Sequence, residues 1–593
     1  MSIIRRVARL DPHSYAESEQ PVTERIDLAL KVDFAQRVLS GEVLLTLREP
    51  SAGPLDLDTR DLRIGAVETP EGAPLRYELG TPERILGTRL RVQLPPATRA
   101  IRVRYSTSPQ ASALQWLAPS QTAGGQHPYL YSQCQPIHAR SLAPLQDTAR
   151  IRVRAGARFT VPAHLRALMA AAPLGREVAG EGEVIDLFEM PQPIPPYLLA
   201  FAVGDLSPRQ LSQRSAVWAE RSVADAAAWE LDGVETMMQV AEDLFGPYEW
   251  ERYDILVMPP SFPFGGMENP RLTFATPSLL AGDRSLVNVI AHELAHAWTG
   301  NLVSNATLEH FWLNEGFTVY AERRILEALE GAEAAELHAA VGLHELEVSL
   351  QRFATRPELT RLRTQMAGVD PDEAYSTVPY EKGYLFLRRL EELTGRERWD
   401  RFLRAYLDRF RFQSIATEDF LRFLDERLPG VSARAGAQRW IDGPGLPPDA
   451  PRPQSRRLEE LRELARRTGQ GVLPDENTAV RMQPTELLVF LQSLPELPAE
   501  VCGQLDALLG LSRRRSLELR HTFVLVQLRA GVEAGREAAR RVLRETGRMK
   551  YLRPIYTELA RRPQTRALAR EIYDEARESY HPIARTVVES ILG

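Results

Sequence analysis

The run His292-Glu293-Leu294-Ala295-His296 constrains this chain more than any other segment, because it places two imidazoles one helical turn apart. Four residues are slightly more than one turn of α-helix, so His292 and His296 project from one face and can hold a single metal ion. After eighteen intervening residues comes Glu315, which offers a third ligand. Two imidazoles and one carboxylate suit Zn²⁺ and leave its fourth position open, as in catalytic rather than structural zinc sites.

Chance is the alternative explanation, since with 11 histidines in 593 residues roughly 2 in 100 such chains would contain this motif. The surrounding residues favour a helix, with Asp283 or Ser285 as its N-terminal cap and Gly300 after its end. Apolar residues recur there at helical spacing, namely Leu286, Val289, Ile290, Leu294 and Ala297. The motif and its context together predict a metal-binding helix.

Residues 314–329 form a second predicted helix, which carries Glu315 and Glu322 two turns apart on one face. Glu322 could orient one of the ligand imidazoles by accepting a hydrogen bond from it. It could equally be a surface carboxylate paired with a neighbouring arginine.

Upstream of these helices lies Gly265-Gly266-Met267-Glu268-Asn269. This run, followed by His-Glu-x-x-His and a glutamate eighteen residues further on, resembles the signature of the gluzincin aminopeptidases. Within that group the chain is similar to the leukotriene A hydrolase family and its bacterial aminopeptidase relatives, over residues 133–135, 261–323, 370–383 and 547–550. Because the matches spread from residue 133 to about 582, they indicate similarity of the whole chain.

The pattern along the chain predicts a multidomain α+β protein. Short alternating segments such as 42–47 and 99–105 predict an N-terminal antiparallel β-sheet domain over 1–206. Mostly helical periodicity follows over 207–442, with one strand-like run at 253–258. The resemblance implies that this part is a thermolysin-like zinc catalytic domain.

A proline-rich linker is predicted over 443–455, where the eleven residues from Gly443 to Pro453 include five prolines and two glycines. Helical segments with short connections follow over 456–593, for example at 499–511, 517–530 and 535–546. They predict an α-helical C-terminal domain of stacked helix pairs, an α-α superhelix in the resembling family.

The resemblance also implies roles for individual residues. Glu293 corresponds to the general base that activates water, and Tyr380 to the tyrosine that stabilises the oxyanion. Gln135 and Glu268 correspond to residues that recognise the free N-terminal ammonium of a peptide. Gly265, Gly266 and Met267 belong to the same substrate-binding segment. From the sequence alone, Tyr380 would be a buried aromatic residue, Glu268 a turn carboxylate and Gln135 a strand-end amide.

Arg548 and Lys550 match the family segment that holds the carboxylate of short peptides, which would favour tripeptides or similar lengths. Asp372 and Tyr375 match polar residues that line the substrate cleft. Phe264 departs from the pattern, because the mammalian leukotriene enzyme has tyrosine at this position. Losing that hydroxyl bears on a lipid activity more than on a peptidase activity.

These observations predict a zinc aminopeptidase with one Zn²⁺ per chain, acting on short peptides with a free N-terminus. Two other classes of protein are consistent with part of these observations. A lipid epoxide hydrolase could use the same metal as a Lewis acid, with Asp372 positioning the attacking water. A non-enzymatic helical-repeat scaffold with a structural zinc is disfavoured, because an open site with a glutamate beside its first ligand is the wrong design for a closed metal centre.

The composition limits the partners and the compartment. A net charge of -6 is small for 593 residues and indicates neither nucleic acid nor a membrane as partner. The first twenty residues hold no apolar run long enough for a signal peptide. Only Cys134 and Cys502 are present, so no disulfide framework is expected. The cytoplasm is therefore the predicted compartment, and the oligomeric state is left open, with a monomer plausible.

Overall fold

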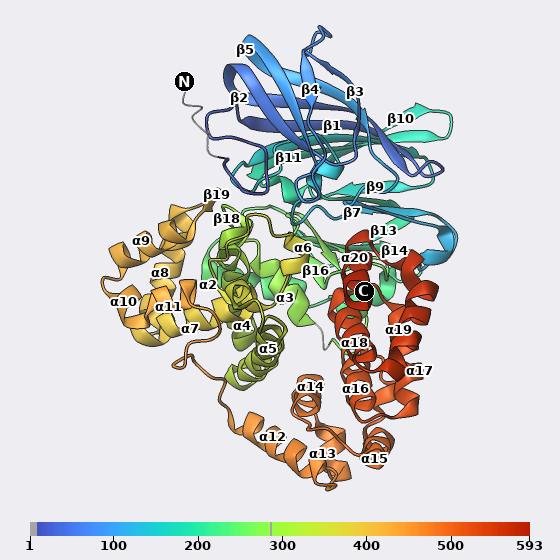
Figure 1. The fold of residues 1–593 in the computed structure, drawn as a ribbon, viewed down its shortest axis with the longest axis vertical. Coiled ribbons are helices and arrows are strands. Elements are labelled where there is room, and N and C mark those ends of the chain that lie inside the picture. Colours follow the sequence, from blue (N-terminus) through green and yellow to red (C-terminus); the bar gives the residue numbers. More distant parts are fainter. Residues whose placement is uncertain (1–8, 285–286) are drawn as a thin grey trace.

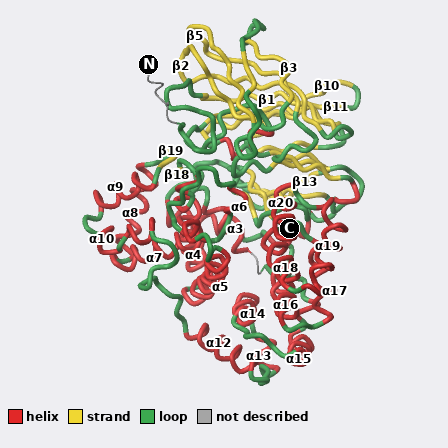
Figure 2. The backbone as a smooth tube through the Cα atoms, in the orientation of Figure 1, coloured by secondary structure: helices red, strands yellow, loops and turns green. Residues whose placement is uncertain are grey.

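The computed structural model describes residues 9–284 and 287–593, which form three bodies in chain order (Figure 1). The first body is built of strands, the second mixes strands with helices and the third contains helices alone, as the colouring of Figure 2 shows. The predicted three-domain α+β architecture is thus confirmed. Among the helices of the described residues, none combines the length and apolarity needed to cross a bilayer.

An eight-stranded sheet dominates the N-terminal body. In β2, Val43, Leu45 and Leu47 are buried while the residues between them are partly exposed, so one face of the sheet packs on the core. The order is β10-β11-β8-β1-β2-β5-β3, with β4 also paired to β5. The strands are β1 (Thr23–Asp33), β2 (Val38–Thr59), β3 (Arg63–Glu68), β4 (Tyr77–Leu79), β5 (Thr88–Ser106), β8 (Val153–Pro162), β10 (Ala172–Gly180) and β11 (Glu183–Ile194).

One strand pair of this sheet departs from the predicted antiparallel pattern. β1 and β8 run parallel, with Ile26 opposite Ala155, whereas the other pairs in the sheet are antiparallel. The long chain between β1 and β8 allows the crossover that a parallel pair requires. A second, four-stranded antiparallel sheet lies below it, with the order β6 (Leu114–Leu117), β7 (Tyr129–Ser132), β12 (Phe201–Gly204) and β9 (Arg166–Met169).

The middle body begins with a five-stranded mixed sheet, in which β15 confirms the strand predicted at 253–258. Its order is β13 (Leu206–Gln210), β14 (Ala216–Glu220), β15 (Asp254–Val257), β17 (Leu272–Ala275) and β16 (Gly266–Met267). A parallel pair, β18 (Val303–Asn305) and β19 (Gln413–Ile415), is separate from it. The helices are α1 (Ala224–Glu230), α2 (Val234–Phe245), α3 (Val287–Ala295), α4 (Trp312–Glu330), α5 (Ala332–Arg352), α6 (Pro371–Ala374), α7 (Gly383–Thr394), α8 (Arg396–Arg409), α9 (Thr417–Arg427), α10 (Val431–Ala435) and α11 (Ala437–Asp442).

The two helices that carry the metal motif, α3 and α4, form and pack against each other, but α3 ends at Ala295, earlier than the predicted end close to Gly300. The predicted cap Ser285 and the apolar residue Leu286 lie outside the described residues. Tyr380 lies on a short π-helix, Val378–Lys382, directly before α7. Such π-helical turns are often found at functional sites.

Residues 443–455 contain neither helix nor strand and lead into the helical C-terminal body. Its helices are α12 (Arg456–Gly469), α13 (Glu476–Arg481), α14 (Pro484–Gln492), α15 (Ala499–Leu509), α16 (Leu517–Arg529), α17 (Glu533–Glu545), α18 (Met549–Arg561), α19 (Pro563–Ala576) and α20 (Pro582–Leu592). Neighbours such as α16 with α17 and α18 with α19 pack as antiparallel pairs. Leu337 and Ala340 of α5 join one apolar core of this body, so it is anchored directly on the middle one.

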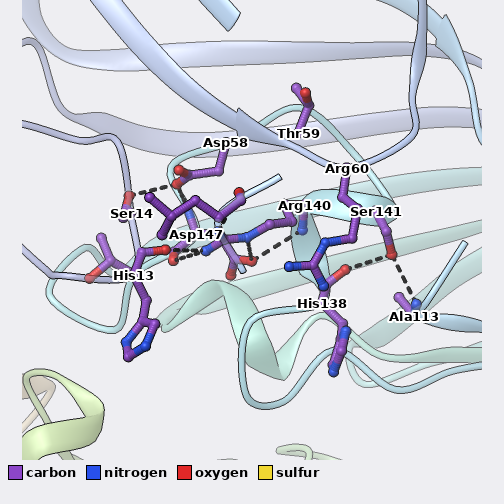
Figure 3. A network of polar contacts seen from close by, with 12 residues as sticks. His13, Ser14, Asp58, Thr59, Arg60, Ala113, His138, Arg140, Ser141 and Asp147 are labelled. Atoms are coloured by element: carbon purple, nitrogen blue, oxygen red, sulfur yellow. Dashed lines mark hydrogen bonds and ion pairs between the residues drawn. The ribbon is translucent and has the colours of Figure 1, made fainter. Parts of the chain in front are cut away.

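A buried arginine organises the base of the N-terminal body (Figure 3). The Arg140 side chain donates from Nε to Asp147 Oδ2 at 2.9 Å, from Nη1 to Leu86 O at 2.9 Å and from Nη2 to His13 O at 2.6 Å. Asp58 accepts the backbone N–H of Asp147 at 2.8 Å. A buried guanidinium with so many partners ties loops distant in sequence into one rigid base facing the middle body.

Candidate active site

Three candidate metal ligands meet between α3 and α4. His296 directly follows the last residue of α3, where its N–H bonds to His292 O at 3.3 Å, and Glu315 lies in the first turn of α4. The two Nε2 atoms are 3.2 Å apart, and Glu315 Oε2 is 3.4 Å from that of His292 and 3.5 Å from that of His296. Glu315 Oε2 is buried and has no hydrogen-bond partner among the described residues. An orphaned carboxylate oxygen facing two imidazole nitrogens fits a bound cation, and this donor set suits zinc.

The opposite nitrogen of each imidazole is held by a hydrogen-bond acceptor. His292 Nδ1 lies 3.0 Å from Glu322 Oε2, so the structure favours the orienting role for Glu322 over the surface alternative. His296 Nδ1 lies 3.0 Å from Thr299 O and 3.1 Å from Thr318 Oγ1. These contacts turn both Nε2 atoms toward the shared site, as acceptors behind metal-bound imidazoles do.

Glu293 points into the same space and is 6 % exposed. Burial raises its pKa to about 8; the charge of His292 opposes this rise and that of Glu315 adds to it. Gly266 makes room for this carboxylate, because a Cβ at residue 266 would lie 2.2 Å from Glu293 Oε1 and 2.5 Å from its Cγ. The glycine therefore sets how closely the edge strand β16 approaches the carboxylate.

Glu268, with Gln135 beside it, adjoins the cluster of candidate ligands. Gln135 Nε2 donates to Glu268 Oε1 at 3.2 Å. Ligand atoms of Glu268, Glu293 and His296 lie within 4.8 Å of one another. Burial raises the pKa of Glu268 well above its ordinary value, and the charges of Glu315 and Glu293 raise it further. Three buried carboxylates in one pocket form a site that favours cations.

Tyr380 stacks its ring on His292 with 6.1 Å between centroids, and its hydroxyl donates to Tyr375 OH at 3.4 Å. Burial raises the pKa of Tyr380 well above its ordinary value, so the phenol stays protonated and can donate a hydrogen bond. Phe264 packs against Tyr375 with 6.1 Å between ring centroids. Phe264, where the mammalian enzyme has tyrosine, thus forms an apolar wall beside Tyr375.

Arg548 and Lys550 enter the site from the start of α18. Arg548 is 6 % exposed and donates from Nη1 to Ser278 Oγ at 3.1 Å and to Tyr551 OH at 3.0 Å. Lys550 Nζ lies 3.0 Å from both Glu345 Oε1 and Glu518 Oε1. Two carboxylates already neutralise Lys550, so Arg548 is the more available of the two cations.

Asp372 is held from the N-terminal body. His138 Nε2 lies 3.0 Å from Asp372 Oδ2, and His138 Nδ1 lies 2.8 Å from Ser112 Oγ. His13 Nε2 contacts the segment just before α6, at Val369 O, at 2.9 Å. Figure 3 shows both histidines on the face of the Arg140 network that points away from the large sheet. His138 was not predicted from the sequence, because no spacing rule connects it with Asp372, more than two hundred positions away.

A cavity of about 460 Å³ is lined by the candidate metal ligands and by the groups around them, and it continues between α5 and the helices α16 and α18. Asp372 and Met267 are the predicted site residues that do not line it. Asp372 instead lines an adjoining, largely apolar cavity of about 80 Å³ together with Gln135 and Tyr375. Predicted residues that line the main cavity are Gln135, Gly265, Gly266, Glu268, His292, Glu293, His296, Glu315, Tyr375, Tyr380, Arg548 and Lys550.

Met267 is 2 % exposed, and its sulfur accepts a hydrogen bond of 3.2 Å from Gln133 Nε2. Successive side chains of a strand point to opposite faces, and Gly266 already faces Glu293. The Met267 side chain therefore points away from the cavity, and its segment can meet a substrate there only through the backbone.

Three family models match successive parts of the chain. They are the Peptidase M1 N-terminal domain over residues 15–198, the Peptidase family M1 domain over 229–439 and Leukotriene A4 hydrolase, C-terminal, over 482–592.

Individual relatives match almost the full length. Leukotriene A-4 hydrolase of Xenopus laevis is 38% identical, and leucine aminopeptidase 2 of Neosartorya fischeri is 35% identical, each over 98% of both chains. The solved structure of yeast LTA4 hydrolase in complex with bestatin superposes with a TM-score of 0.90 at 32% identity, over 98% of this chain and 97% of that one.

The fold and the site define a three-domain zinc metallopeptidase. The chain belongs to peptidase family M1, and its C-terminal domain is of the leukotriene A4 hydrolase type.

Proposed function

We propose that this enzyme removes the N-terminal residue from short peptides and binds one Zn²⁺ per chain through His292, His296 and Glu315. The observation that carries the proposal is the position of Glu268, buried within 4.8 Å of the Glu293 and His296 ligand atoms. Among the described residues, Glu268 is paired with neither a lysine nor an arginine. The α-ammonium of a peptide would supply the missing positive charge and fix cleavage one residue in.

The proposed chemistry follows from the groups around that ammonium. When bound, zinc lowers the pKa of a water molecule and polarises the scissile carbonyl. Glu293 accepts a proton from the attacking water and passes it to the leaving amine. The Tyr380 hydroxyl donates a hydrogen bond to the carbonyl oxygen as that oxygen gains charge. Gln135 holds Glu268 in place, since its amide donates to the same carboxylate.

The test compares free and N-acetylated peptides of the same sequence. The parent enzyme should cleave only the free peptides, because acetylation removes the charge that Glu268 binds. Glu268→Gln should lower kcat/KM for the free peptides by about 10- to 150-fold, the loss of a hydrogen bond between charged groups, while zinc content stays the same. Equal cleavage of acetylated and free peptides would identify an endopeptidase and overturn the proposal.

We assign binding of the C-terminal carboxylate of a short peptide to Arg548, with Lys550 as a neighbour that is already paired with Glu345 and Glu518. Support comes from the burial of Arg548 within the cavity that holds the metal ligands. Tyr375 and the backbone of 265–267 would contact the peptide between its two ends. Asp372 would act on substrates from the adjoining cavity.

Opening of a lipid epoxide is the second candidate, and the identity with the Xenopus leukotriene hydrolase favours it. The adjoining apolar cavity, lined by Phe264, Phe311 and Leu362 among others, would receive the hydrocarbon chain. Its volume of about 80 Å³ is well below that of an ordinary ligand pocket, roughly 300 Å³ or more, which favours the peptidase. Incubation with a long-chain allylic epoxide, followed by analysis for the diol, tests this activity.

Domain limits and the compartment complete the proposal. We place the boundaries at 1–206, 207–442 and 456–593, with 443–455 as the linker. The assignment of residues 443–455 as a linker is supported by the absence of helix and strand from them. The cytoplasm remains the proposed compartment, and the buried cysteines Cys134 and Cys502, both free thiols, are compatible with it.

A further inference from the structure

The main cavity continues beyond the metal ligands as a groove between two helices. On α5 its lining residues recur at helical spacing, at His338, Val341, Glu345, Val348 and Arg352. On α16 they do the same, at Glu518, His521, Leu525 and Arg529. Each helix therefore presents one continuous face to the groove. The start of α18 adds Arg548, Lys550 and Arg553.

The charged groups at the centre of the groove are paired with one another. Lys550 bridges Glu345 of α5 and Glu518 of α16 at 3.0 Å each, which leaves this triad with one net negative charge. Arg548 is buried deeper in the cavity. Glu345, Lys550 and Glu518 are therefore already paired, and Arg548 belongs to the carboxylate anchor proposed above.

The mouth of the groove holds a different kind of charge. There, beside Tyr375 and Val348, which are 37% and 52% exposed, lie Arg352 and Arg553. Across the described chain, no carboxylate lies within ion-pair distance of either guanidinium. Arg352 donates to Tyr375 O, and Nη2 of Arg553 is buried without a hydrogen-bond partner. Most other arginines that line the main cavity, such as Arg529, have a glutamate within ion-pair distance.

The positive charge of Arg553 also destabilises that of Arg352. Burial lowers the pKa of Arg352 to about 10, and the positive charge of Arg553 lowers it further. Burial likewise lowers the pKa of Arg553. Two cations that repel each other while partly removed from water would both be stabilised by an anion between them.

We propose that Arg352 and Arg553 form a second anion subsite at the mouth of the groove, which binds a carboxylate of a peptide that extends past Arg548. This subsite rests on the proposed peptidase function and refines its specificity. It selects longer peptides that carry either an acidic side chain or a C-terminal carboxylate at the mouth. A partly exposed ion pair of this kind contributes about a two- to fivefold preference.

The experiment measures kcat/KM for peptides of three to six residues in matched pairs. One arm compares glutamate with glutamine at each position after the second, in C-terminal amides. The other arm compares the free acid with the amide and uses no acidic side chain. The parent enzyme should prefer the charged member of a pair by about two- to fivefold at one length or position, and added salt should reduce that preference. The arm in which it occurs identifies the source of the carboxylate.

Variants assign the preference to the two arginines. Arg553→Gln and, separately, Arg352→Gln should bring the charged-to-neutral ratio close to one, and Arg553→Lys should retain part of it. The ratio is used because any general loss of activity affects both members of a pair equally. Arg356→Gln is the matched control, since Arg356 is an exposed arginine near α5 that pairs with Glu358. It should leave the ratio unchanged.

Three outcomes overturn the subsite. They are a charged-to-neutral ratio near one at every length in the parent enzyme, a ratio that both glutamine variants retain, and a ratio that Arg356→Gln lowers as much as they do. Failure of the peptidase proposal is distinct, because acetylated peptides would then be cut as well as free ones whatever the charge at the mouth.

Discussion

His292 Nδ1 and Glu322 Oε2 are joined by a contact of 3.0 Å that links the first metal-ligand helix to the second. Glu322 lies two turns after Glu315 on α4, so one face of this helix supplies both a ligand and the group behind another ligand. The contact fixes which nitrogen of His292 turns toward His296 and Glu315. The geometry of the site therefore depends on the packing of α3 against α4.

Glu322→Gln should weaken zinc binding by about 10- to 100-fold, because an amide orients the imidazole but does not strengthen it as a ligand. Competition with a chromogenic chelator measures this affinity directly. Glu330→Gln is the control, since Glu330 is exposed at the end of the same helix and should leave the affinity unchanged. A Glu322→Gln enzyme with the zinc affinity of the parent would refute the orienting role.

Gly266→Ala should lower kcat by at least about tenfold while zinc content is retained. A methyl group at residue 266 would overlap Glu293 Oε1, Cδ and Cγ, at 2.2, 2.4 and 2.5 Å, so the whole carboxylate must shift. A displacement of this size near the reacting atoms is enough for such a loss. Stopped assays on an amino-acid anilide, with metal analysis of the same samples, measure both quantities.

The controls for this prediction bracket the expected effect. Glu293→Gln should also retain zinc and lose most turnover, because the base itself is removed. Gly503→Ala should leave activity unchanged, since no atom lies within 4 Å of the added methyl group. Full activity in Gly266→Ala would show that the position of Glu293 is not limiting.

The ligand set was predictable from sequence because it depends on local geometry. His292 and His296 are related by the spacing of one helical turn at the end of α3, and Glu315 and Glu322 by two turns along α4, and the sequence displays both spacings directly. The contacts that were missed join distant segments. Glu345 and Glu518 reach Lys550 from two other helices, and no periodicity along α18 encodes that meeting. The orientation of Met267 depends on the alternation of an edge strand only two residues long, too short to be recognised from the sequence.

Arg548→Ala should lower kcat/KM for free tripeptides by roughly 1.5 to 3 kcal/mol, the contribution of a hydrogen bond to a charged group. It should have much less effect on an amino-acid anilide, which has no carboxylate to bind. Steady-state kinetics on the two substrates, side by side, give the difference. Equal losses on both would mean that Arg548 supports domain packing through Ser278 and Tyr551 rather than substrate binding.

Lys550→Met should destabilise the protein near neutral pH, and the deficit should shrink in mild acid. Burial alone would raise the pKa of Glu518, but the charges of Lys550 and Arg548 lower it to about 2. A carboxylate with a lowered folded-state pKa stabilises the protein above its ordinary pKa of about 4.5, and this contribution is lost as the pH falls toward 2. Without Lys550, Arg548 is the main charge that still opposes the effect of burial, so the pKa of Glu518 is higher than in the parent and its protonation relieves the penalty as the pH falls.

The measurement is the thermal midpoint at pH 7.5 and at pH 5. We expect Lys550→Met to lose a few degrees at pH 7.5, from roughly 1 to 2 kcal/mol after allowance for the partial exposure of Lys550, and less at pH 5. Adding Glu518→Gln should restore part of the loss and remove its pH dependence. Lys31→Met is the matched control, because Lys31 pairs with Glu183 at 2.6 Å on an exposed surface and should change the midpoint little. If Lys550→Met is as far below the parent at pH 5 as at pH 7.5, then Lys550 does not set the ionisation of Glu518, and the bridge between α5 and α16 contributes to stability by packing alone.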